Sequence, residues 1–253
     1  MTNIFASDYD GTLFKDFIIR DEDIEAIKKF RSLGHKFGIV TGRSINSILD
    51  EVQSYNIPVD FLVGVNGGIV LDHEMKEVNA HKMDESVTEE LLKCIDEYGV
   101  KSYGVNDGYY HTRVLYEDIK AGENLEVFEK VLANGISGMY IATHGPEDSI
   151  ELANIINERF KENEVRCFAN ESYVDVGTIH NSKTTGIEDI IKNYNYTGQV
   201  FSVGDSYNDI PMLKDFNGYL MNNGVRELLK FAKCGLVSTV GEAIYKTIDK
   251  LEL

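Results

Sequence analysis

Cysteine is scarce in this chain. There are three, Cys94, Cys167 and Cys234, and they lie far apart in the sequence and in no CxxC spacing. A disulfide framework or a zinc site needs cysteines grouped at characteristic spacings. We therefore expect thiols buried in a core, in a protein that works in a reducing compartment.

Long apolar runs are also missing. No stretch approaches the roughly 20 apolar residues of a membrane-spanning helix. The first residues do not combine a basic segment with an apolar one, as a signal peptide does. The chain has no repeat and no low-complexity linker. These features predict a protein without a membrane partner and with a cytoplasmic location.

Positive charge is in deficit. Lys and Arg number 25 against 42 Asp and Glu, which gives a formal net charge of -17. Because nucleic-acid binding needs clustered basic residues, we expect no nucleic-acid partner. A small anionic substrate stays compatible with this charge if a metal ion and local cations outweigh the field at the site.

The rest of the composition is that of an ordinary globular protein. The chain has 253 residues, of which 43% are hydrophobic and 26% charged. This length is enough for one large domain or two modest ones, each with a real core.

The chain is organised around FASDYDGTLF at positions 5–14. An apolar run is followed at once by Asp8 and Asp10, and then by Gly11. Because an unpaired buried charge is too costly inside a strand, the strand should end near Ser7 with Asp8 at its carboxyl tip. Ligands bind at this edge of open α/β sheets. Two nearby carboxylates and a Gly that permits a tight turn suit a hard cation and covalent chemistry.

The first 68 residues alternate between strand and helix patterns. The apolar periodicity predicts strands at 4–7, 35–40 and 61–65, with helices at 21–33 and about 45–52. This βαβαβ order with short loops predicts an α/β fold with a doubly wound parallel sheet. The polar loops that follow the three strands would then share one edge of the sheet.

The pattern changes between residues 82 and 177. Helices are expected at 87–98, 125–132 and 149–160, and strands at 100–105, 109–116, 139–143, 165–169 and 174–176. Asn106-Asp107-Gly108, between the first two of these strands, is a hairpin signal. We predict an inserted α+β domain over 82–177 and a core domain made of 1–81 and 178–253. In the last part of the core, helices are expected at 183–192, 225–231 and 240–251, and strands at 199–203, 218–221 and near 236.

Polar residues stand at or beside the ends of the predicted core strands. Asp8, Asp205 and the backbone carbonyl of Asp10 offer the oxygen ligands that Mg²⁺ prefers. The Thr41 hydroxyl, the backbone N–H groups beside it and the Lys183 ammonium suit the oxygens of a phosphoryl group. These segments predict one pocket for Mg²⁺ and a phosphate ester.

The residue types also predict a reaction. Asp8 is best placed to attack phosphorus and form an aspartyl phosphate. Asp10 would protonate the leaving alkoxide and later take a proton from the attacking water. Asp209 would support the site by anchoring Lys183 or a metal-bound water.

Four segments resemble the motifs of the haloacid dehalogenase (HAD) superfamily, in the same order: FASDYDGTLF, IVTGRS, the lone Lys183 within NSKTTGI, and VGDSYNDIPML. The position of the insert, and Asn66-Gly67-Gly68 after the third strand, are similar to the Cof-type (IIB) phosphatases with a C2 cap. The resemblance implies a Rossmann-like core, a cap that chooses the substrate, and Mg²⁺-dependent hydrolysis of phosphomonoesters through an aspartyl phosphate.

The resemblance also implies a role for each matching residue. The roles are the nucleophile Asp8, the acid/base Asp10, the phosphate-binding Thr41, Gly42, Lys183 and Asn208, the metal-binding Asp8, Asp10 and Asp205, and the supporting Asp209. Tyr9 departs from the family, in which Leu or Met is commoner. We expect its side chain to point away from the pocket with little effect, and Arg43 to pair with a nearby carboxylate.

The predicted function is hydrolysis of a small phosphorylated metabolite, such as a sugar phosphate or a phosphorylated cofactor. Two alternatives stay open. A phosphomutase would pass the phosphoryl group of the same aspartyl phosphate to a second hydroxyl, and the core residues do not separate the two. A non-catalytic phosphoacceptor module, similar to receiver domains, would also use an acidic pocket with Thr and Lys. Asp10 argues against it, because an acid/base beside the nucleophile shortens the life of the acyl phosphate.

Overall fold

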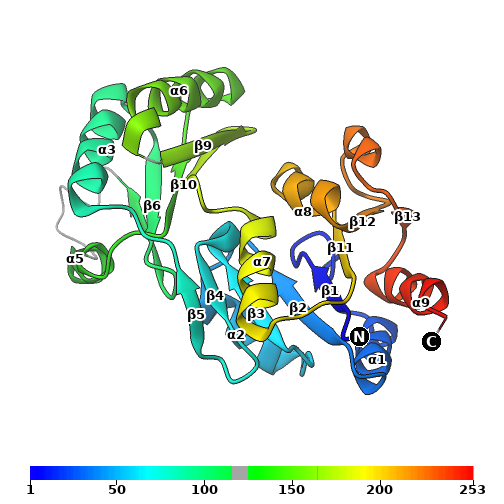
Figure 1. The fold of residues 1–253 in the computed structure, drawn as a ribbon. Coiled ribbons are helices and arrows are strands. Elements are labelled where there is room, and N and C mark those ends of the chain that lie inside the picture. Colours follow the sequence, from blue (N-terminus) through cyan, green and yellow to red (C-terminus); the bar gives the residue numbers. More distant parts are fainter. Residues whose placement is uncertain (116–124, 164, 253) are drawn as a thin grey trace. The chain divides into compact units, whose positions relative to one another are not determined.

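The computed structural model describes residues 1–115, 125–163 and 165–252. This part of the chain divides into two compact units (Figure 1). The first unit contains Met1–Arg43, Ile48–Asn79 and Ser182–Leu253, and the second contains Ser44–Ser47 and Ala80–Asn181.

The first unit is built on one sheet with the strand order β13-β12-β11-β1-β2-β3-β4-β5. The strands are β1 (Ile4–Ser7), β2 (Lys36–Val40), β3 (Phe61–Gly64), β4 (Ile69–Leu71), β5 (Glu77–Ala80), β11 (Val200–Gly204), β12 (Asn217–Met221) and β13 (Gly235–Val237). The strands from β13 to β3 pair in parallel. The predicted α/β class is therefore confirmed.

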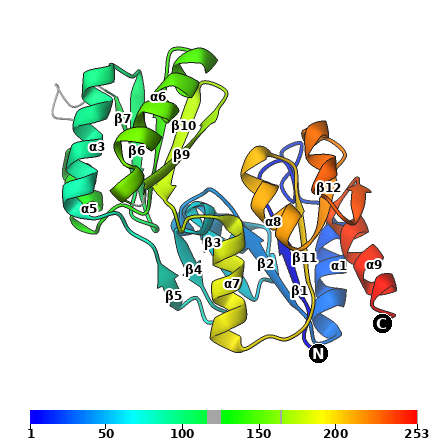
Figure 2. The ribbon, with the colours of Figure 1, turned by 45° about the horizontal axis from the view of Figure 1, so that its top comes forward.

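Helices connect these strands along the chain. They are α1 (Asp21–Ser32), α2 (Ile45–Ser54), α7 (Lys183–Tyr194), α8 (Ile210–Asp215) and α9 (Val240–Lys250), with short 3-10 turns η1 (Val65–Gly67), η3 (Tyr207–Asp209) and η4 (Arg226–Lys230). Figures 1 and 2 both place α1 beside α9, close to the two ends of the chain.

Alternate residues of β1 serve the two faces of the sheet. Phe5 packs against Phe30 of α1 and Phe37 of β2, with ring centroids 5.9 and 6.2 Å apart. Ile4 and Ala6 point to the other face, into a core cluster shared with α7 and α8. Because both faces of the sheet are buried, a charged side chain is accommodated only beyond the end of β1, where Asp8 follows Ser7.

The second unit is a five-stranded antiparallel sheet with helices. The strand order is β7-β6-β8-β10-β9. The strands are β6 (Ser102–Asn106), β7 (His111–Leu115), β8 (Gly138–Ala142), β9 (Val165–Asn170) and β10 (Tyr173–Thr178), and the helices are α3 (Glu85–Tyr98), α5 (Leu125–Ala133), α6 (Pro146–Arg159) and the 3-10 turn η2 (Lys161–Asn163). Figure 2 shows α3 and α6 side by side over this sheet.

The structure corrects the expected elements in two places. The sheet of the first unit also contains β4 and β5, which were not predicted, and β4 runs antiparallel to β3. The intervening η1 turn is too short for the crossover that a parallel pair requires. The helix predicted at 225–231 is instead the 3-10 turn η4. The predicted hairpin of β6 and β7 is present, and Tyr116, the last residue predicted for its second strand, lies outside the described residues.

Among the described helices, none has the length and apolarity to cross a membrane.

Candidate active site

The site lies at the carboxyl ends of β1 and β11, which are neighbours in the sheet. The strands are parallel and in register, with Ser7 opposite Val203, so Asp8 and Asp205 leave the sheet side by side. The Asp8 backbone N–H donates to the Val203 carbonyl oxygen at 3.0 Å. Residues almost two hundred positions apart are thus brought together by strand pairing alone.

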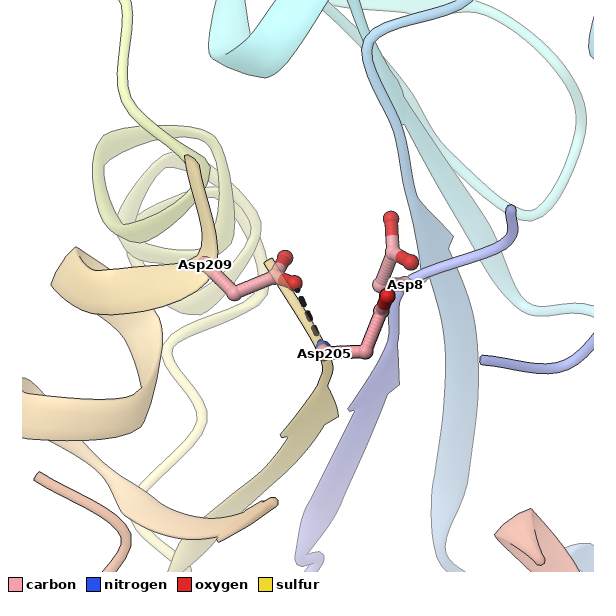
Figure 3. A group of neighbouring side chains, drawn as sticks. All are labelled: Asp8, Asp205 and Asp209. Atoms are coloured by element: carbon pink, nitrogen blue, oxygen red, sulfur yellow. Dashed lines mark hydrogen bonds between the residues drawn. The ribbon is translucent and has the colours of Figure 1, made fainter. Parts of the chain in front are cut away.

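Three carboxylates gather at this point. Oxygen atoms of Asp8, Asp205 and Asp209 all lie within 4.8 Å of one another (Figure 3). Asp8 and Asp209 are buried and Asp205 is half-buried. Like charges this close repel strongly in a water-poor environment, so the cluster requires compensating cations.

Lys183 supplies one compensating charge. Its side chain is fully buried, and its Nζ donates to Asp8 Oδ1 at 2.6 Å and to Asp209 Oδ1 at 2.5 Å. It is the first residue of α7, whose N-cap Ser182 accepts a hydrogen bond from the Thr185 N–H. Gly67, at φ +101°, allows this end of α7 to approach closely, because a Cβ there would lie 2.2 Å from the Ser182 carbonyl oxygen.

Asp209 links this ion pair to the loop after β11. Its Oδ2 accepts a hydrogen bond from the backbone N–H of Asp205 at 2.8 Å (Figure 3). The same oxygen accepts from the backbone N–H of Ser206 at 2.9 Å. One carboxylate thereby fixes the Lys183 ammonium and the backbone that presents Asp205.

The environment shifts the pKa values of these groups. Burial raises the pKa of Asp8 above its ordinary value, and Asp209 adds to the rise while Lys183 opposes it. Burial disfavours the charged form of Lys183, but Asp209 and Asp8 outweigh burial and raise its pKa. Burial and the charge of Asp209 also raise the pKa of Asp205. The three carboxylates are electrostatically undercompensated by a single ammonium, as expected of a pocket that takes up a cation.

Sequence reasoning missed Thr12 as part of the site. Its hydroxyl donates to Asp205 Oδ1 at 2.9 Å. Gly11, at φ +81°, passes so close that a Cβ would lie 2.7 Å from Asp205 Oδ2. The signal lay in DGT itself, where Gly allows the close approach and the next residue carries a hydroxyl.

The Asp10 carboxyl group has a different partner. Its side chain is 51% exposed, and its two oxygens accept from Arg43 Nε and Nη2 at 2.8 and 2.6 Å. Arg43 also donates from Nη1 to Glu51 Oε1 at 3.0 Å. The expected pairing of Arg43 with a carboxylate is confirmed.

The remaining predicted residues, Thr41, Gly42 and Asn208, lie after β2 and β11, and Asn66, which follows β3, contacts two of them. The buried Thr41 hydroxyl accepts from the Arg43 backbone N–H at 3.1 Å. The Asn66 side chain lies against Gly42, 3.4 Å from the position of an added Cβ, and its Oδ1 accepts from Asn208 Nδ2 at 3.2 Å.

The backbone at Asn66, to which the sequence alone assigns no role, has an unusual conformation. Both Val65 and Asn66 have φ +51°, a left-handed conformation that is costly for a β-branched residue. Such strain clusters at functional sites. The signal in the sequence was Asn before two Gly residues.

Comparison with known proteins places the fold in context. A family model described as haloacid dehalogenase-like hydrolase matches residues 5–248. A protein of Buchnera aphidicola named "Putative phosphatase" is 29% identical over 149 residues, and the match spans 55% of either chain, about half the length of that relative. A protein of Mycoplasma pneumoniae with the same name is 23% identical over 238 residues, covering 83% of this chain and 81% of that one.

Solved structures share the fold. A HAD subclass IIB sugar phosphatase has 21% sequence identity with this chain and a TM-score of 0.75, with 99% of each chain covered. At this level of sequence identity, the similarity shows a shared fold.

Proposed function

The chain belongs to the haloacid dehalogenase-like hydrolases, and from this premise we propose that it is a phosphatase that forms an aspartyl phosphate on Asp8. The observation that carries the proposal is the buried Lys183 ammonium, 2.6 Å from Asp8 Oδ1, beside the carboxylates of Asp205 and Asp209. An aspartate at a strand end, next to a fixed cation, is suited to attack an anionic phosphorus centre.

The first chemical step joins Asp8 to phosphorus. An Asp8 oxygen bonds to phosphorus as the bond to the ester oxygen breaks, and Asp10 gives a proton to the departing alkoxide. Lys183 and the Thr41 hydroxyl hold phosphoryl oxygens, as do the backbone N–H of Gly42 and the Asn208 amide. Charge stabilisation and positioning dominate phosphoryl transfer, so fixed donors of this kind carry most of the rate.

The second step releases phosphate. Water attacks the phosphorus of the aspartyl phosphate, its proton passes to Asp10, and the bond to the Asp8 oxygen breaks. The enzyme returns to its starting state. General acid–base assistance of this kind contributes about 10²- to 10⁴-fold to the rate.

The acidic cluster fits a divalent cation. Three carboxylates share the compensation of one ammonium, and hard oxygen donors favour Mg²⁺. We propose that the carboxylates of Asp8 and Asp205 and the backbone carbonyl of Asp10 hold Mg²⁺, with Asp209 in support. The ion would neutralise charge on the phosphoryl oxygens.

Changing Gly11 to Ala is expected to weaken Mg²⁺ binding about 10- to 100-fold, as losses around metal ligands commonly do. The new methyl group would lie 2.7 Å from Asp205 Oδ2 and displace that carboxylate. The measurement is the Mg²⁺ dependence of the rate, together with calorimetric Mg²⁺ titration of the protein without substrate.

Gly34→Ala is the matched control. Gly34 has φ +86°, close to the +81° of Gly11, but nothing lies within 4 Å of an added Cβ. It carries the same left-handed cost, about 1–2 kcal/mol, without touching the site. Equal Mg²⁺ affinity in wild type and Gly11→Ala would remove Asp205 from the metal site.

The substrate we propose is a small phosphorylated metabolite such as a sugar phosphate or a phosphorylated cofactor. The similarity of the whole chain to a subclass IIB sugar phosphatase supports this class. We propose that an α+β domain over 82–177 chooses the leaving group. The second compact unit, which contains Ser44–Ser47 and Ala80–Asn181, supports a division near these positions. The core at 1–81 and 178–253 is assigned the chemistry.

A panel of phosphorylated metabolites, assayed with Mg²⁺ and with a chelator, tests the function. Mg²⁺-dependent release of inorganic phosphate from at least one of them is expected. An isomeric phosphate ester in place of free phosphate would identify a phosphomutase. A long-lived phosphorylated protein with no turnover would identify a phosphoacceptor module instead.

A further inference from the structure

Tyr9, Glu51 and Arg43 form a chain of contacts that ends at Asp10. The buried Tyr9 hydroxyl donates to Glu51 Oε2 at 3.0 Å, and Glu51 Oε1 accepts from Arg43 Nη1 at 3.0 Å. Arg43 then holds both oxygens of Asp10. The guanidinium carbon lies 4.9 Å from the centre of the Tyr9 ring. Tyr9 thus supports the Arg43 guanidinium in two ways, directly through its ring and indirectly through its hydrogen bond to Glu51.

The two ends of this chain differ in burial. Tyr9 is completely buried, and its ring stacks on Phe14 with the centroids 5.5 Å apart. Asp10 is 51% exposed at its side chain. A half-exposed carboxylate on a loop has several rotamers open to it, and holding one of them costs conformational entropy. Through these contacts, the buried Tyr9 ring restricts the rotamers of the exposed Asp10 carboxylate.

The charged groups in this chain of contacts alternate in sign, because the positive Arg43 lies between the negative Glu51 and Asp10. Glu51 lies on α2, so the anchor is tied to a helix and not only to the loop of Asp10. Asp10 and Glu51 share the guanidinium, which lets the planar fork of Arg43 engage both at once. Arg43 takes one acceptor site on each Asp10 oxygen. Because a carboxylate has about four such sites, room remains for the proton that Asp10 handles.

We infer that Tyr9, Glu51 and Arg43 are positioning residues for Asp10, and that they act on proton transfer to the leaving group. The inference rests on the proposed function, in which Asp10 is the acid/base. It revises the expectation that Tyr9 has little effect: its side chain is withdrawn from the pocket and still governs the site through two partners. A misplacement of about 1 Å is enough to cost about 100-fold in rate.

The leaving group gives the test its selectivity. A poor alkoxide leaving group needs a proton as its bond breaks, whereas p-nitrophenolate leaves without one. Tyr9→Phe keeps the ring and loses the hydroxyl, and Glu51→Ala removes the link between the hydroxyl and Arg43. We expect the rate of ester cleavage in the first turnover, which precedes the attack of water, to fall with the best alkyl phosphate of the metabolite panel. The fall should be about 3- to 10-fold in Tyr9→Phe and about 10- to 50-fold in Glu51→Ala. With p-nitrophenyl phosphate the loss in the first turnover should stay below about twofold. Single-turnover measurement separates this step from the release of phosphate, which uses Asp10 with every ester.

Tyr219→Phe is the structural control. Tyr219 is a second buried tyrosine of the same unit, whose hydroxyl accepts a hydrogen bond from the Thr247 hydroxyl at 3.1 Å. It is expected to keep the wild-type rates with both esters. Equal losses on both esters in Tyr9→Phe and Glu51→Ala, with lowered thermal stability, would reduce the chain of contacts to a structural role and overturn the inference.

A double-mutant cycle isolates the route through Asp10. If Glu51 acts through Asp10, Glu51→Ala added to Asp10→Asn should cost nothing further on the alkyl ester. A second full loss would overturn the inference. If wild type hydrolyses neither ester, the proposed function fails. If wild type hydrolyses both and Asp10→Asn selectively slows first-turnover cleavage of the alkyl ester while Tyr9→Phe and Glu51→Ala do not, the function stands and the positioning role falls.

Discussion

Replacing Asp8 by Asn is expected to lower phosphate release at least about 10⁴-fold, because the amide is no nucleophile and nucleophile deletions have effects of this size. The same change is expected to stabilise the metal-free protein. Asp8 shares a small space with Asp205 and Asp209, and an amide oxygen can still accept the Lys183 hydrogen bond. Removing one of these charges should raise the midpoint of thermal unfolding in a chelator by about 2–4 °C, or about 1 kcal/mol.

Two comparisons make this result specific. Asp16→Asn removes an exposed carboxylate from the same loop, at a residue whose φ of +56° suits Asn, and should leave rate and stability unchanged. Phosphate release by Asp8→Asn at a rate near that of wild type would rule out covalent catalysis by this residue. A lower unfolding midpoint would show that Asp8 stabilises the apo site.

Replacing Lys183 by Met is expected to have the largest effect on stability. The ammonium is fully buried and bonded to Asp8 and Asp209. Breaking a buried ion pair from one side leaves uncompensated charge and costs about 3–5 kcal/mol. The phosphoryl group also loses a fixed cation, which is expected to lower kcat about 10²- to 10³-fold. Thermal and denaturant unfolding measure the first effect, and steady-state kinetics the second.

The partner variant separates the two effects of Lys183. Adding Asp209→Asn to Lys183→Met removes one orphaned carboxylate and should recover part of the lost stability, but no activity. Lys192→Met removes an exposed lysine from the same helix α7 and serves as the control. If Lys183→Met unfolded like wild type, the buried bridge to Asp8 and Asp209 would not be a feature of the protein in solution.

The positions of the main acidic residues were predictable from the sequence for a simple reason. A charge cannot sit inside a strand that is buried on both faces, so Asp8 and Asp205 mark the ends of β1 and β11. Parallel pairing then brings strand ends together whatever their separation along the chain. The apolar periodicity indicated the approximate bounds of most strands and helices.

Other features depend on contacts that no local pattern encodes. The short strand β4 returns antiparallel because Val65, Asn66 and Gly67 all adopt positive φ, which is not expected of a β-branched residue. The bond between Tyr9 and Glu51 joins residues 42 positions apart and depends on how α2 packs. The 3-10 form of η4 likewise depends on packing, since its apolar pattern also fits an α-helix.

The central claim is that phosphorus becomes bonded to Asp8 during turnover. Asp10→Asn, which slows the attack of water, should be mixed with p-nitrophenyl phosphate, whose leaving group needs no proton, and with Mg²⁺. The mixture is then quenched in acid and digested for mass spectrometry of its peptides. We expect a phosphoryl group on Asp8 that hydroxylamine removes and that is missing when Asp8 is also changed to Asn. A phosphoryl group on any other residue, or full turnover of Asp10→Asn with no phosphorylated peptide, would contradict it.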